Sequence, residues 1–295
     1  MRYILRMDRH TLANGQVSAV ILAQGAELAS LQDASGHQYL WQAGPEWPRH
    51  APLLFPIIGE LNDGRYLHRG RTYRMGRHGF ARDRRFVWLE TTPERCRLVL
   101  TDDAASHAIY PFAFRLEAAF LLRGATLSIT YALTNTGAED LPASLGAHPA
   151  FRWPLTDGVP KTAHSLTFAS PEPEPIKRLN TAGLIIPETN LPLGSQTLPL
   201  DPALFGDDAM IFDPVASRSI RYAATGGPAL TVAWDGFPSL GVWSKPEADL
   251  LCIEPWHGTA DPAGFEEDFV LKPGLMHIPP GAERLLTYSI TLEAA

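Results

Sequence analysis

The sequence of 295 residues predicts an all-β fold, a large antiparallel β-sandwich that forms a single domain over residues 1–295. Three observations support this prediction. Apolar residues occupy every second position in several segments, as in strands with one buried face. The 24 glycines and 26 prolines are spread along the chain and leave little room for long helices. Strand patterns of the same kind occur on both sides of residues 154–202, so no domain boundary is indicated there.

Four segments carry the alternation most clearly. They are residues 95–100, 112–120, 126–133 and 286–292. Polar side chains fill the intervening positions of the last three, so one face of each strand is expected to contact solvent. The short connection around Gly124 predicts that two of these strands form a hairpin.

Two further segments predict connections. Asn14 and Gly15 lie between apolar runs and predict a hairpin with a type I′ turn, in which both central residues need positive φ. Residues 154–202 contain nine prolines and little alternation, which favours extended connections that wrap the surface. No repeat of fixed period is visible, which argues against a β-propeller.

Composition excludes several classes of function. Acidic residues outnumber basic residues, 32 against 25, and no run of lysine and arginine could follow a phosphate backbone, so nucleic acid is not an expected partner. No stretch approaches 18 apolar residues, and charged residues occupy the early positions where a secretory signal has its apolar run. Cys96 and Cys252 lie in apolar runs, which predicts two buried free thiols and a reducing compartment. We therefore expect a soluble cytoplasmic protein without membrane contact.

Three polar clusters stand out because the common nucleotide-binding, serine-hydrolase and metal motifs are absent. The clusters are residues 77–83, 146–151 and 252–258, and each combines an ionisable group with turn-forming residues and an aromatic ring. This mixture suits a sugar site, where aromatic faces stack on sugar rings and polar side chains bind hydroxyls.

Local chemistry nominates three of these residues without deciding their roles. Glu254 follows the apolar run 250–253 and precedes a proline, so it is expected at the end of a buried strand, where burial raises the pKa of a carboxyl group toward that of a useful acid or base. A structural carboxylate paired with an arginine is the alternative. His148 and His78 adjoin turns and could be structural or functional.

Six separated blocks resemble the aldose 1-epimerase (mutarotase) family in order and spacing, and are most similar to its LacX-type branch. They are residues 54–59 (LFPIIG), 63–66 (DGRY), 78–83 (HGFARD), 148–151 (HPAF), 208–212 (DAMIF) and 254–258 (EPWHG). The resemblance implies a galactose mutarotase-like β-supersandwich that needs no cofactor. It also implies that Glu254 is the general base at the C1 hydroxyl and His148 the general acid at the ring oxygen, whereas His78 and Asp208 contact the sugar.

One position departs from the family pattern. Glu60 stands where many relatives carry an arginine, so Arg65 or Arg82 could supply the cation, or activity on ordinary hexoses could be weak. Alternatively, Glu60 points to solvent and pairs with a neighbouring arginine. We assign Arg82 to the substrate site, although it also belongs to a charged turn, residues 82–85, that could be merely solvated.

Trp41, Trp243 and Trp256 could each stack on a sugar, and Trp256 is the best placed because it lies two residues from Glu254. The two histidines and two carboxylates of the site could form a metal set. They lack a short ligand spacing, and no metal site is predicted.

The leading function is therefore an aldose 1-epimerase acting on a free small-molecule sugar, as a monomer or homodimer. The alternatives are a hexose-phosphate mutarotase, a non-catalytic sugar-binding or regulatory protein of the same fold, and a glycosidase that uses Glu254 and Asp208 as its two carboxylates.

Overall fold

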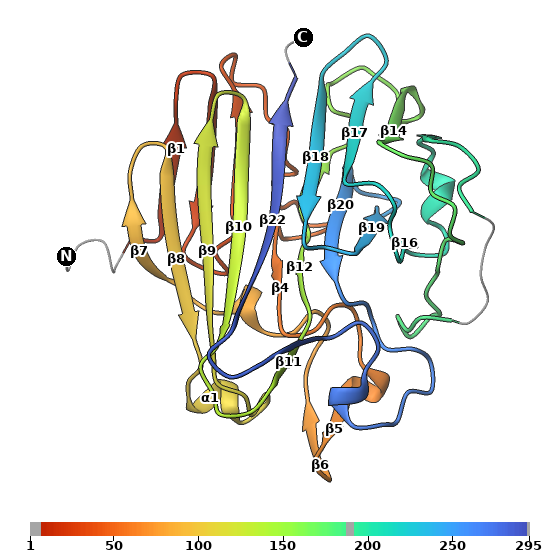
Figure 1. Ribbon diagram of the computed structural model, residues 1–295. Coiled ribbons are helices and arrows are strands. Elements are labelled where there is room, and N and C mark those ends of the chain that lie inside the picture. The colour runs from red at the N-terminus through yellow and green to blue at the C-terminus, as the bar shows by residue number, and fades with distance from the viewer. Residues whose placement is uncertain (1–6, 187–191, 294–295) are drawn as a thin grey trace.

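Two large antiparallel sheets dominate the computed structural model, which describes residues 7–186 and 192–293 (Figure 1). The first sheet has nine strands. In spatial order they are β15 (Thr197–Pro199), β14 (His164–Phe168), β17 (Ser219–Ala224), β18 (Ala229–Asp235), β22 (Glu283–Leu292), β10 (Thr126–Asn135), β9 (Phe114–Arg123), β8 (Arg95–Thr101) and β7 (Val87–Thr91). All its neighbouring strands run antiparallel.

The second sheet lies behind the first in Figure 1 and carries the pocket described below. Its strands are β16 (Met210–Phe212), β19 (Ser239–Trp243), β20 (Leu250–His257), β12 (Leu145–Ala147) and β4 (Leu53–Leu54), with β13 (Ala150–Arg152) also paired to β20. Smaller sheets comprise β1 (Arg9–Ala13), β2 (Val17–Leu22) and β3 (Leu28–Asp33), the pair β5 (Arg65–His68) and β6 (Arg71–Arg74), and the pair β11 (Leu141–Ala143) and β21 (Met276–Ile278).

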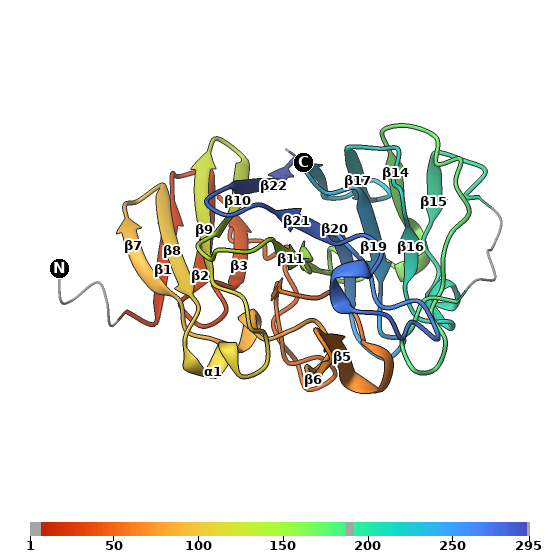
Figure 2. The ribbon, with the colours of Figure 1, turned by 60° about the horizontal axis from the view of Figure 1, so that its bottom comes forward.

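Helices are short throughout the described residues. They are α1 (Ala104–His107) and the 3-10 turns η2 (Asn62–Gly64), η3 (Ala81–Asp83), η4 (Lys161–Ala163), η5 (Pro202–Phe205) and η6 (Phe269–Leu271). Figure 2 shows β1, β2 and β3 beneath the β7 to β10 side of the large sheet. Buried side chains from these layers form one apolar cluster, which includes Ile21 of β2, Ile129 of β10 and Ile253 of β20. The predicted all-β sandwich is confirmed.

The alternation predicted for the long strands is confirmed residue by residue. Strands β9, β10 and β22 bury every second side chain along the faces that the sequence indicates. On the other face, cross-strand threonines bond through their hydroxyl groups, at 2.9 Å between Thr126 and Thr291 and at 2.9 Å between Thr130 and Thr287. The hairpin at Gly124 is also present, since Arg123 pairs with Thr126. Hydroxyl pairs of this kind satisfy polar groups on a partly exposed face.

Two predictions about connections need correction. Strands β1 and β2 do form a hairpin, but its central turn residues are Gly15 and Gln16, because the Asn14 N–H donates to the Val17 carbonyl oxygen. Gly15 has positive φ and Gln16 does not, so the turn is not type I′. The Asn14 side chain instead accepts hydrogen bonds from the Gln16 and Val17 N–H groups. Residues 154–202 contain β14, whose buried side chains alternate over only five residues, and the three-residue strand β15, so the segment is not made of connections alone. Residues 187–191 of that segment lie outside the described residues.

The prediction of two buried free thiols is confirmed, because Cys96 and Cys252 are both buried and free. Among the described residues, no helix has the length and apolar character needed to cross a membrane.

Candidate active site

A cavity of about 110 Å³ lies against the six-stranded sheet. All six residues that the sequence nominates line this one cavity: Glu254, His148, His78, Asp208, Arg82 and Trp256. They are separated by up to 178 positions in the chain, and the sheet order brings them together.

Strand β20 supplies one wall of the cavity. Glu254 and Trp256 both line the cavity, as expected for residues two apart on a strand, and Cys252 occupies the preceding alternate position. The sequence predicts that the strand ends at Glu254, and this is wrong. The strand continues through Pro255, which pairs with Leu240 of β19, so Glu254 is held from both sides within a buried strand.

His148 faces Glu254 because two short strands share one register against β20. Gly146 of β12 pairs with Trp256, and Ala150 of β13 pairs with Cys252. Residue 148 lies midway between these two pairings and therefore opposite Glu254. This antiparallel pairing places two side chains together that are far apart in the sequence.

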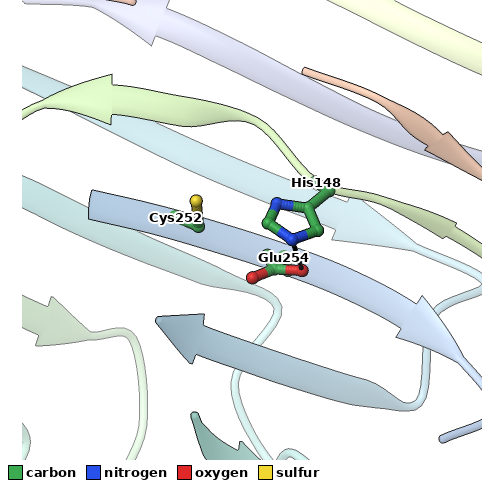
Figure 3. Close-up of side chains that lie close together, drawn as sticks. All are labelled: His148, Cys252 and Glu254. Carbon is green, nitrogen blue, oxygen red and sulfur yellow. Dashed lines mark ion pairs between the residues drawn. The ribbon is translucent and has the colours of Figure 1, made fainter. Parts of the chain in front are cut away.

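The His148 imidazole and the Glu254 carboxylate form a buried pair (Figure 3), with Nε2 and Oε2 separated by 3.3 Å. Burial raises the pKa of the Glu254 carboxyl group well above its usual range, and the negative charge of Asp208 adds to this increase. Burial lowers the pKa of His148 to about 3, with a further contribution from the positive charge of Arg82. Both shifts favour the uncharged form of each group, and the two groups titrate as one coupled pair.

Two atoms of the pair lack hydrogen-bond partners. Glu254 Oε2 and His148 Nδ1 are buried without hydrogen-bond partners, and the 3.3 Å contact lacks hydrogen-bond geometry. A buried polar atom without a partner is costly, so these atoms are available to a ligand.

His78 is fixed by the backbone around it. Its φ is 66°, and its Nδ1 accepts a hydrogen bond from the Gly59 N–H at 3.1 Å. That bond leaves the other ring nitrogen, Nε2, as the protonated donor of a neutral imidazole. Gly79 follows at φ 72°, where a Cβ atom would lie 2.2 Å from the Phe55 carbonyl oxygen, so only glycine fits this close approach.

Trp256 is held by two glycines on the neighbouring strands. A Cβ atom at Gly241 of β19 would lie 2.5 Å from the indole ring, and one at Gly146 of β12 would lie 2.7 Å from it. The ring therefore occupies the space above both glycines and gives the cavity an aromatic surface beside Glu254.

Asp208 and Arg82 complete the cavity with opposite charges. Asp208 has positive φ, 65°, just before β16, and its Oδ1 accepts from the Ala209 N–H. Arg82 donates to the Arg77 carbonyl oxygen at 2.6 Å, while its buried Nε has no hydrogen-bond partner and lies 3.9 Å from Asp83 Oδ2. Burial, together with the charge of Arg49, lowers the pKa of Arg82 to about 10, which still leaves it cationic at neutral pH.

A sequence profile of the aldose 1-epimerase family matches residues 8–275. The chain belongs to the aldose 1-epimerase family. It is 32% identical over 295 residues to protein LacX of Lactococcus lactis subsp. lactis, in both its plasmid and chromosomal forms, which covers 95% of this chain and 98% of LacX.

Solved structures agree with this assignment. A galactose mutarotase related enzyme from Lactobacillus acidophilus superposes with a TM-score of 0.92 at 30% identity, covering 97% of each chain. A galactose mutarotase-like protein from Lactobacillus casei ATCC 334 gives a TM-score of 0.89 at 29% identity, covering 97% of this chain and 100% of that chain. The predicted galactose mutarotase-like fold and the predicted resemblance are confirmed.

The departure at Glu60 is resolved in favour of a local ion pair. Glu60 Oε1 accepts from Arg77 Nε at 2.9 Å, and Arg77 lines the cavity of this aldose 1-epimerase family member. Arg82 lines it as well, whereas Arg65 lies in the β5–β6 hairpin and pairs with Asp63. Of the two arginines that could replace the missing family cation, Arg82 is the one at the site.

The sequence does not nominate three neighbours of the pair as site residues. Trp47 stacks on His148 with ring centroids 5.1 Å apart, and Trp243 meets the same ring edge-on at 5.9 Å. Trp243 was considered but not selected, and Trp47 lies in a proline-flanked segment without a strand pattern to place it. The third neighbour is Cys252, whose thiol belongs with His148 and Glu254 to the one group among the described residues that could hold a metal ion.

Proposed function

We propose that this protein is an aldose 1-epimerase that interconverts the α and β anomers of a free aldose. The observation that carries the proposal is the buried, unsatisfied pair of His148 and Glu254, 3.3 Å apart, at a cavity with polar and aromatic walls. Family membership supports it independently.

Ring opening requires one proton that the coupled pair can hold and transfer. With one proton between them, the productive arrangement has it on His148, which leaves Glu254 as the base. Glu254 takes the proton of the C1 hydroxyl as His148 gives its proton to the ring oxygen, and the bond between C1 and the ring oxygen breaks to give the open aldehyde. After rotation about C1–C2, closure returns both protons along reversed paths and yields the other anomer.

The remaining residues suit sugar binding. The Nε2–H of His78 is a donor for a sugar hydroxyl, Asp208 is an acceptor, and Arg82 brings a cation with an unpartnered N–H. The Trp256 ring offers a face for stacking. An acid and a base are sufficient for this reaction, so our proposal includes no cofactor.

A hexose-phosphate mutarotase is the second candidate, because Arg77 and Arg82 both line the cavity. Arg77 is already paired with Glu60, and Asp208 adds a negative charge, so we favour neutral aldoses. A non-catalytic sugar-binding protein is the third candidate, since Glu60 replaces the family arginine.

Polarimetry of freshly dissolved aldoses and their 6-phosphates tests these candidates together. We expect faster mutarotation of a neutral hexose such as glucose or galactose, with a lower kcat/KM for the matching phosphate. A clear preference for phosphates would favour the second candidate. Sugar binding without acceleration of mutarotation would favour the third.

A further inference from the structure

Cys252 lies beside the pair but has no part in the proposed proton transfers. The ligand atoms of His148, Cys252 and Glu254 lie within 4.8 Å of one another (Figure 3). We propose that these three side chains form a binding site for a thiophilic divalent cation such as Zn²⁺, and that the bound cation inhibits the enzyme. Inhibition rests on the proposed function, whereas cation binding does not.

The donor set matches the chemistry of zinc. An imidazole nitrogen, a thiolate sulfur and a carboxylate oxygen are its usual protein ligands, at bond lengths that put neighbouring ligand atoms about 3.3 to 3.6 Å apart in a tetrahedron. The Nε2–Oε2 separation is already 3.3 Å. The Cys252 sulfur lies within 4.8 Å of the other two ligand atoms, on the same strand as Glu254, and has to move closer to them to complete the site.

Unsatisfied atoms provide a second, independent observation. His148 is 7% exposed and Glu254 is 1% exposed, yet His148 Nδ1 and Glu254 Oε2 have no hydrogen-bond partners. A cation held by His148 Nε2 and Glu254 Oε2 would supply the interaction that the carboxylate oxygen lacks, but not the one that Nδ1 lacks, because an imidazole binds one ion through one ring nitrogen. The Cys252 thiol proton and the proton held by the His148–Glu254 pair both leave to solvent as the ion binds, because the thiolate, the neutral imidazole and the carboxylate are the ligand forms.

The position of the site explains why a cation would inhibit. His148 and Glu254 line the cavity and Cys252 lies fully buried next to them, so an ion can enter only from the cavity side. Three protein ligands leave a fourth position for water, as in open zinc sites. A bound ion would occupy the acid and the base together, and sugar and cation would therefore exclude each other.

The test compares the wild-type protein with Cys252→Ala and with Cys96→Ala, which removes the other buried thiol from strand β8. Cobalt(II) titration reports binding without reference to activity, because a thiolate ligand gives Co²⁺ a near-ultraviolet charge-transfer band. We expect the band in wild type and Cys96→Ala and its absence in Cys252→Ala. Polarimetry should show inhibition by Zn²⁺ that is competitive with sugar and is reversed by EDTA.

Cys252→Ala should keep the mutarotation rate and lose sensitivity to Zn²⁺ by about ten-fold or more, since even an outer-shell partner of a metal ligand is worth about 10- to 100-fold in affinity. Absence of the thiolate band in the wild type would overturn the site. Equal Zn²⁺ inhibition of wild type and Cys252→Ala would also overturn it. If no mutarotation is detected in any variant, the proposed function fails and the cobalt band alone decides the cation site.

Discussion

Two ion pairs among the described residues have both side chains less than one-tenth exposed, and they are built differently. Lys272 Nζ lies 2.7 Å from Asp261 Oδ1, while Asp261 Oδ2 accepts from the Asn62 N–H at 2.9 Å. The His148–Glu254 pair has a longer contact of 3.3 Å and leaves atoms on both partners without hydrogen bonds. Both carboxylate oxygens of Asp261 accept hydrogen bonds within the protein, whereas the His148–Glu254 pair needs a ligand to satisfy its unpartnered atoms.

We interpret the Lys272–Asp261 pair as one that stabilises the fold and the His148–Glu254 pair as one that serves catalysis. The Asp261 N–H also donates to the Glu60 carbonyl oxygen, so the satisfied pair ties together segments that border the cavity. Removing one partner of a satisfied buried pair strands a charge and costs stability. Removing one partner of the unsatisfied pair relieves an existing cost and is expected to affect catalysis instead.

The largest expected effect is on catalysis by Glu254→Gln. The amide keeps the shape of the side chain but has no basic carboxylate, so kcat should fall by about 10²- to 10⁴-fold with a much smaller change in sugar binding. The measurement is polarimetry on protein whose fold is checked by circular dichroism. His148→Asn should lose activity similarly, and the double variant should be little worse, because both groups serve one proton-transfer cycle.

Glu172→Gln is the matched control for that change. Glu172 is also buried, at 3% exposure, but it accepts hydrogen bonds from the Ala216 and Ser217 N–H groups, and it does not line the cavity. Its variant should keep the wild-type kcat. Near-normal mutarotation by folded Glu254→Gln would exclude Glu254 as the base and make Asp208 the next residue to test.

Lys272→Met should show the opposite pattern. It leaves the Asp261 carboxylate buried without its cation, so the free energy of unfolding should fall by about 3–5 kcal/mol, while kcat of the folded protein stays close to the wild-type value. Urea unfolding and polarimetry measure the two effects. Lys177→Met is the control, because the Lys177–Asp213 pair is about one-third exposed and should contribute less than about 1 kcal/mol. Equal losses of stability in both variants would contradict the comparison.

The pH dependence of kcat/KM should reveal the shared proton. This parameter reports the free enzyme, in which burial holds the pKa of His148 at about 3 and raises that of Glu254. Activity should fall in acid as the pair takes up a second proton, and fall in alkali as it loses its only one. The apparent pKa of each limb of the profile belongs to the pair and not to His148 or Glu254 alone. With EDTA present, we expect a broad plateau through neutral pH, and an ascending limb near the ordinary histidine value of about 6.5 would contradict this.

The sequence predicts the parts of this site that depend on local patterns, and it does not predict the parts that depend on contacts between distant segments. Alternation along 250–253 indicates a buried strand, and the motif blocks contain the six nominated residues that line the cavity. The sequence cannot show that β12 and β13 share one register, which alone puts His148 opposite Glu254. Pairing across 106 positions depends on long-range packing. For the same reason, local patterns do not place Trp47 against His148. They leave the pairing of Glu60 with a neighbouring arginine as one of the alternatives.

The smallest expected effect concerns Asp208, whose charge contributes to the difference between the two pairs. Its carboxylate disfavours ionisation of Glu254 and so raises the Glu254 pKa, after burial as the larger cause. Asp208→Asn removes that charge, so the pair should lose its proton more readily. The alkaline limb of kcat/KM should therefore move to lower pH, whatever the change in sugar binding does to the height of the profile. Asp207→Asn changes an exposed neighbouring carboxylate that does not line the cavity, and it should leave the limb in place. A limb that stays fixed in Asp208→Asn would mean that burial alone holds the proton on this pair, and a limb that moves equally in both variants would mean that the charge effect is not specific to Asp208.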